Sequence, residues 1–191
     1  MLAHNQGQQL NASRIAASLG ISGHTVARYL DLLVDLLLVR RLPAWSGNSS
    51  KRLSKAPKVY VRDSGIVHAL LGLESVDDVL GHPVAGSTWE GMVVESVIAA
   101  AGRAPVSFYR TAVGAEIDMV LEGRGGEQYA IEITRSTAPA VSKGFWIGRD
   151  DLGAADALVI YPGRERIPLG VSAEALGLRE ALLWVWERVS L

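Results

Sequence analysis

Apolar residues recur at helical spacing in the first third of the chain and are interrupted once by a glycine. Leu10, Ile15 and Leu19 fall on one stripe, and Gly20 follows directly. The pattern resumes after Ser22 with Val26, Tyr29, Leu30, Leu33 and Leu37. Glycine permits a tight turn and serine commonly caps a helix, so this spacing predicts a helix-turn-helix with its turn at Gly20.

Two short strand-like stretches follow, Val39-Arg-Arg-Leu-Pro at residues 39–43 and Lys58-Val-Tyr-Val-Arg at 58–62, and they bracket a loop rich in Gly, Ser and Lys. This arrangement predicts a β-hairpin that would form the wing of a winged helix over residues 1–63. Residues 64–86 are expected to connect it to the next domain through two short helices, near 66–71 and 77–80.

The remaining residues, 87–191, are predicted to form an α/β (mixed α+β) domain. A helix is expected at 88–101 and a closing helix at 178–189, where Trp184 and Trp186 fall on different faces. Four strands are expected at 106–110, 115–121, 128–134 and 157–161. The middle two are joined by Gly-Arg-Gly-Gly, which predicts a hairpin within a mixed sheet flanked by helices.

Carboxylates occupy regular positions in that predicted hairpin. Successive side chains of a strand point to opposite faces of the sheet. Asp118 therefore lies on the face away from Ile117 and Met119, and Glu132 on the face away from Ile131. If the apolar faces align, Asp118 and Glu132 share the other face, where they would suit a hard divalent cation. Two alternatives remain open: a merely solvated face, and a helix-dipole role for Glu90, which together with Glu95 is a candidate third ligand.

Composition limits the classes of function. The chain has no Cys and a net charge of -1, and its apolar runs are too short to span a bilayer. A cytoplasmic protein without membrane contact is therefore expected. No G-x-x-x-x-G-K-[ST] motif occurs, so the chain is predicted to have no ATP site.

Basic residues cluster in two places in the predicted winged helix. The second helix would present His24, Thr25 and Arg28 to a DNA groove, with Arg14 near the backbone. The predicted wing carries Lys51, Arg52, Lys55 and Lys58. These residues make DNA a candidate partner, although acidic residues on the second helix and the use of winged helices in protein binding leave that open.

Several motifs occur together in order: Lys51-Arg-Leu-Ser-Lys-Ala-Pro-Lys-Val-Tyr-Val-Arg-Asp-Ser-Gly, Trp89-Glu-Gly, Phe108-Tyr-Arg, Gly114-Ala-Glu-Ile-Asp-Met-Val and Ile131-Glu-Ile-Thr-Arg-Ser. In this the chain resembles the C-terminal domain of unknown function that follows the ATPase module in prokaryotic AAA-type predicted ATPases. The resemblance implies a winged helix-turn-helix followed by a restriction-endonuclease-like domain of the PD-(D/E)xK kind. It also implies that an N-terminal AAA ATPase module is missing from this chain.

The same resemblance assigns roles to four residues. Asp118 takes the place of the metal-binding aspartate, Glu132 that of the acidic residue of the triplet, and Glu90 that of the helix glutamate. Thr134 stands where the catalytic lysine belongs, and a hydroxyl supplies no positive charge. Lys143 is a candidate replacement for that cation. Weak binding of Mg²⁺ or Mn²⁺ is expected, with little cleavage.

The expected function is therefore a nucleic-acid-binding or substrate-recognition region of an AAA-type ATPase with a degenerate nuclease-like core. Whether it is an enzyme stays open at this point. The alternatives are an active Mg²⁺-dependent DNA nuclease, and a transcriptional regulator or protein interaction module without catalysis. An oligomer is compatible with each of them.

Overall fold

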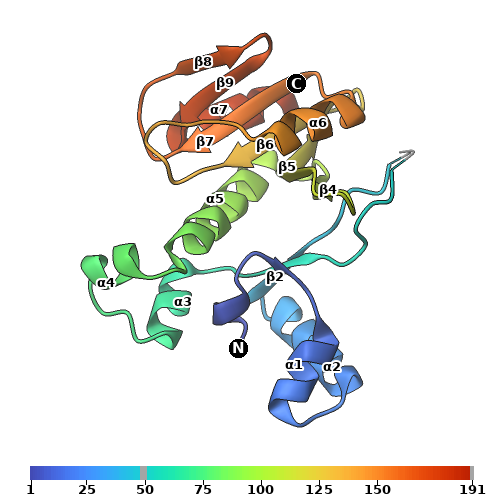
Figure 1. Ribbon diagram of the computed structural model, residues 1–191, viewed down its shortest axis with the longest axis vertical. Coiled ribbons are helices and arrows are strands. Elements are labelled where there is room, and N and C mark those ends of the chain that lie inside the picture. The colour runs from blue at the N-terminus through green and yellow to red at the C-terminus, as the bar shows by residue number, and fades with distance from the viewer. Residues whose placement is uncertain (48–50, 190–191) are drawn as a thin grey trace. The chain divides into compact units, whose positions relative to one another are not determined.

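The computed structural model describes residues 1–47 and 51–189, and within them the chain forms two compact units (Figure 1). The first unit comprises residues 1–42 and 56–92, and the second comprises 43–55 and 93–191. Together they have a mixed α+β architecture, as the sequence predicts. The units interleave along the chain, so a loop of the expected winged helix belongs to the second unit.

The first unit begins with a short 3-10 helix, η1 (Ala3–Asn5), and two α-helices, α1 (Ala12–Leu19) and α2 (Gly23–Asp35). Gly20 ends α1 in the left-handed conformation, with φ 65°. The Ser22 side chain accepts a hydrogen bond from the Thr25 amide and so caps α2. The predicted turn between two helices is therefore confirmed, with a core of Ile15, Ala16, Val26 and Leu30.

The predicted apolar stripes of these helices are only partly buried. Val26 and Leu30 are buried, whereas Leu19, Tyr29 and Leu37 are 51%, 61% and 68% exposed. Successive helical residues are rotated by about 100°, so Tyr29 and Leu30 cannot both face α1. The prediction also carried the second helix too far, because α2 ends before Leu37, which has φ 58°.

An antiparallel sheet completes the first unit, in the order β1 (Gln8–Gln9), β3 (Lys58–Val61) and β2 (Val39–Leu42). The two expected short helices are present as α3 (Ser64–Leu70) and α4 (Val76–Gly81). Helix α5 (Ala85–Ala101) starts three residues earlier than predicted and runs from the first unit into the second.

The second unit contains a six-stranded sheet in the order β4-β5-β6-β7-β9-β8. Its strands are β4 (Val106–Arg110), β5 (Glu116–Glu122), β6 (Gln128–Ile133), β7 (Asp156–Tyr161), β8 (Ile167–Gly170) and β9 (Ala173–Gly177). Strands β5 and β6 form the predicted antiparallel hairpin, with Met119 opposite Ile131. Strand β6 then pairs in parallel with β7, and β7 with β9, which makes the sheet mixed.

Helices cover both faces of this sheet. Ala130 belongs to a buried cluster with Phe145 of α6 (Lys143–Leu152), while the neighbouring Tyr129 packs its ring 5.6 Å from that of Trp184 on α7 (Leu178–Val189). Adjacent strand residues point to opposite faces, so α6 and α7 lie on opposite sides of the sheet (Figure 1). The β5–β6 hairpin is thereby covered near its centre, where Val120 and Ala130 are buried, while Asp118 and Glu132 are partly buried.

No helix in the described ranges, 1–47 and 51–189, combines the length and apolar character that crossing a membrane requires. The expected contrast between the two tryptophans of α7 is confirmed. Trp184 is 4% exposed and Trp186 is 55% exposed.

Candidate functional site

The pairing of β5 with β4 is irregular at the carboxylate of interest. Ser107 pairs with Val120 and Tyr109 with Ile117, so two steps along β4 match three along β5. The extra residue falls within Asp118–Met119, which makes this a β-bulge. Bulges bend the strand and re-aim side chains, and Ile117 and Val120 accordingly share one buried cluster. Strict alternation along this strand, as the sequence predicted, is therefore wrong.

The Asp118 carboxylate contributes to the structure of the sheet. Its Oδ2 accepts a hydrogen bond from the Ile133 amide at 3.1 Å, at the end of β6. Asp118 and Glu132 occupy the next positions beyond the Met119–Ile131 pair, and both are partly buried. The two carboxylates thus lie on neighbouring strands, as the register predicted, while their common face stays a prediction.

Thr134 also uses its polar atom locally. Its Oγ1 accepts a hydrogen bond from the Ser136 amide at 3.1 Å, and its amide donates to the Ile160 carbonyl at 3.0 Å. The residue at the expected lysine position therefore ends the β6 strand in a hydroxyl-stabilised turn. Lys143, the candidate replacement, is exposed at the first residue of α6.

Glu90, the third expected ligand, belongs to the first unit. Its Oε1 accepts hydrogen bonds from the Tyr60 hydroxyl at 2.5 Å and from Lys58 Nζ at 3.3 Å. Tyr60 and Lys58 are 0% and 4% exposed, so this is a buried charged cluster. Glu90 is the sixth residue of α5, beyond its first turn, which makes the predicted role at the helix start wrong.

These contacts bear on the predicted divalent metal site of Glu90, Asp118 and Glu132. Within residues 1–47 and 51–189, no three His, Asp or Glu side chains are grouped as a metal site requires. Glu90 neutralises Lys58, and Asp118 accepts a backbone amide. Glu90 and Asp118 therefore each have a structural contact of their own, and weak binding of Mg²⁺ or Mn²⁺ by Glu90, Asp118 and Glu132 stays a prediction.

The expected wing pairs with the sheet of the second unit. Backbone hydrogen bonds run from Trp45 to the Phe108 carbonyl at 2.7 Å and from Ser54 to the Arg110 carbonyl at 2.9 Å. Residues 43–45 and 52–54 thereby cover the outer edge of β4, which would otherwise present unpaired amides. Both described sides of the expected wing are therefore held against β4, and the centre of its loop, 48–50, lies outside the described residues.

The basic residues of the predicted DNA interface fall into different environments. Lys58 is buried and ion-paired with Glu90, which removes it from the candidates for phosphate contact. Arg14 is exposed and donates to Asn5 and Gln8. The other candidates are exposed or partly exposed: His24, Thr25, Arg28, Lys51, Arg52 and Lys55. Of these, the first three lie on α2 and the last three in the loop that covers β4.

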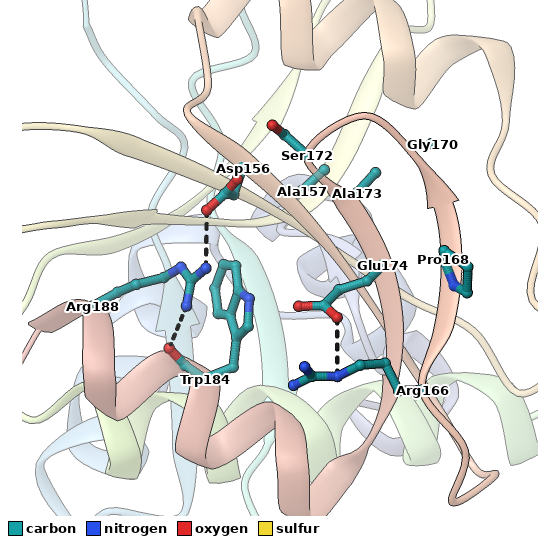
Figure 2. A pocket seen from close by; sticks show the side chains of 10 residues that line it. All are labelled: Asp156, Ala157, Arg166, Pro168, Gly170, Ser172, Ala173, Glu174, Trp184 and Arg188. Carbon is teal, nitrogen blue, oxygen red and sulfur yellow. Dashed lines mark hydrogen bonds and ion pairs between the residues drawn. The ribbon is translucent and has the colours of Figure 1, made fainter.

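A cavity of about 470 Å³ lies beside β7, β8, β9 and α7, where the sequence indicated no site (Figure 2). Arg188 contacts Asp156 at 2.9 Å and stacks 3.5 Å from the Trp184 ring, and Arg166 contacts Glu174 at 3.2 Å. Each arginine therefore faces a carboxylate within the cavity. This balance gives no excess positive charge for an anionic ligand, and the Arg188 contacts join α7 to β7.

Comparison with known proteins identifies the class to which the chain belongs. Residues 85–180 match the family described as a domain of unknown function (DUF4143), and the chain is a member of that family. Residues 1–77 match a second family, also described as a domain of unknown function (DUF8612).

The chain is similar to uncharacterized proteins of Mycobacterium tuberculosis and Mycobacterium bovis, each 38% identical over 176 residues. These 176 residues are 92% of this chain and 40% of each relative, so the chain spans less than half the length of these curated relatives. No solved structure matches it significantly.

Proposed function

We propose that the chain is the recognition region of a longer, cytoplasmic AAA-type ATPase, and that it binds a target without cleaving nucleic acid. The motif resemblance and the greater length of the relatives support this context. The helix pair and the β2–β3 hairpin support a winged helix-turn-helix, and the mixed sheet flanked by helices supports a restriction-endonuclease-like domain.

The observation that carries the proposal is the hydrogen bond between Thr134 Oγ1 and the Ser136 amide. In phosphodiester cleavage a cation at this position would offset negative charge and hold the attacking water. A hydroxyl that already accepts a backbone amide supplies neither effect. Asp118 accepts the Ile133 amide, so a second residue of the predicted catalytic set also has a structural role.

A plasmid-nicking assay with Mg²⁺ or Mn²⁺ tests this directly. We expect no nicking by the parent protein, and an increase above that baseline for Thr134→Lys, which introduces an ammonium group beside the predicted carboxylates. Calorimetry with Mn²⁺ alone should show only weak binding. Robust nicking by the parent that disappears in Glu132→Gln would overturn the proposal and establish the nuclease.

DNA binding is a second candidate, favoured by the exposure of His24 and Arg28 on α2. Such binding would weaken steeply as salt increases, because phosphate contacts release counterions. A His24→Ala, Arg28→Ala variant should then lose affinity for duplex DNA at low salt. Arg179→Ala, which changes an exposed arginine of α7 with no predicted role in DNA binding, is the control. Equal affinity of the double variant and the parent would exclude α2 as the DNA contact.

A further inference from the structure

Three large apolar side chains of the α2 segment are exposed to solvent. Tyr29, Leu32 and Leu36 are 61%, 51% and 58% exposed, and Leu36 is the residue that caps the helix. Their spacing of three and four residues places them on one side of the helix. Val26 and Leu30 fill the core from an adjacent face, about 100° away around the helix. An apolar stripe of this kind commonly marks a contact with another molecule.

Two opposite charges flank the stripe. Arg28 lies four residues before Leu32, and Asp35 lies three residues after it, both exposed. They are seven residues apart, about two helical turns, so they lie along the same edge of the stripe. The surface therefore has a positive end and a negative end on either side of a central apolar residue.

We propose that a second copy of this chain covers the stripe, with the two α2 helices packed antiparallel about a two-fold axis near Leu32. In such an isologous contact the same edges meet with their directions reversed. Arg28 of each copy then faces Asp35 of the other, while the apolar side chains pack between them. In a parallel pairing the two-fold axis runs along the helices and opposite edges of the stripe meet, so Arg28 and Asp35 would not face each other; only the antiparallel pairing brings this charge pair together.

The same features disfavour a nucleic acid as the occupant of this face. Its centre is apolar, and Asp35 at its edge would repel a phosphate. Asp31, on the same helix, is engaged with Arg41 at 2.7 Å. The charges of the face complement its own copy better than they complement a polyanion. This inference does not depend on the proposed ATPase context, but it competes with DNA binding through Arg28, and the test below separates the two.

Sedimentation velocity of the 191-residue chain over a range of concentrations tests the dimer. We expect the parent to dimerise as concentration rises and Leu32→Asp to remain monomeric. Leu70→Asp is the matched control, because Leu70 of α3 is 67% exposed but lies outside the stripe, and it should dimerise like the parent. Thermal melts of each variant establish that it is folded.

Charge reversal then tests the orientation. Arg28→Asp and Asp35→Arg should each weaken dimerisation by about tenfold, and the double variant should recover it because the reversed pair is again complementary. A parent that stays monomeric at all concentrations overturns the proposal. It is equally overturned if Leu32→Asp still dimerises, or if the double variant dimerises as weakly as the single ones. A monomeric parent that binds duplex DNA, and loses that binding in Arg28→Asp, would assign the face to DNA instead.

Discussion

Glu90 in the first unit and Asp118 in the second were both assigned to one metal site by resemblance, and they are satisfied in different ways. Glu90 accepts hydrogen bonds from two side chains, the Tyr60 hydroxyl and the Lys58 ammonium. Asp118 accepts one from a backbone amide, that of Ile133. The charge of Glu90 therefore balances a buried cation, whereas the contact of Asp118 requires only an acceptor oxygen.

The two carboxylates that match the motif thus meet two different structural requirements. A buried ammonium needs a counter-charge, because removal from water penalises an isolated ion. A buried amide at a strand end needs an acceptor, charged or neutral. Replacing each carboxylate by its isosteric amide or by alanine should separate the two requirements.

The largest effect is expected at Glu90. Glu90→Ala removes the carboxylate that faces the buried Lys58 and should lower the free energy of unfolding by about 3 kcal/mol. Glu90→Gln should also destabilise, because it keeps the shape but not the charge. Urea denaturation followed by circular dichroism measures both. The double variant Glu90→Leu, Lys58→Met should be more stable than Glu90→Leu alone, because it no longer buries an unpaired ammonium. A Glu90→Ala protein as stable as the parent would contradict the role of this cluster.

A smaller effect is expected at Asp118. Asp118→Ala leaves the Ile133 amide without this acceptor and should cost about 1.5 kcal/mol. Asp118→Asn retains an oxygen in the same place and should cost less than half as much. Hydrogen exchange at the Ile133 amide provides a local measurement, with faster exchange expected only in the alanine variant. Equal losses in both variants would mean that the charge of Asp118, and not its acceptor oxygen, is what the sheet requires.

Asp78 is an exposed carboxylate, and its replacement is expected to change stability least of the three. Hydrogen bonds from the Ser75 side chain and the Ser75 amide in the capping box of α4 lower the pKa of Asp78 below its usual value of 3.8. Its stabilising contribution is therefore fully present above pH 3.8 and is lost as the pH falls through the lowered value.

The variant Asp78→Asn should accordingly reduce the Tm slightly at pH 7, by about 2 °C or less, and the difference from the parent should shrink as the pH falls toward 2. Thermal melts at several pH values measure this. A difference that stays constant or grows at low pH would show that the carboxylate charge has no part in the cap.

Local signals predicted the helices and the hairpin well because each depends on neighbours in sequence. Gly20 ends α1 and Ser22 caps the start of α2. The Gly-rich turn between β5 and β6 allows the two strands to form a hairpin. Helix α6 was missed although Ser142 and Gly153 cap it in the same way. Strands β8 and β9 were missed because Pro168, Gly170 and small residues give a weak strand pattern; sheet pairing and packing against residues distant in sequence stabilise them.

The sequence by itself determined where the helix pair turns, which strands form the hairpin, and that a threonine stands at the lysine position. Those features depend on residues a few positions apart. Only the tertiary structure decided that residues 43–45 and 52–54 cover β4, that a bulge re-aims the β5 side chains, and that Glu90 neutralises Lys58, 32 residues away in the chain. These contacts join distant segments, and their energies depend on burial, which periodicity along one strand or helix does not specify.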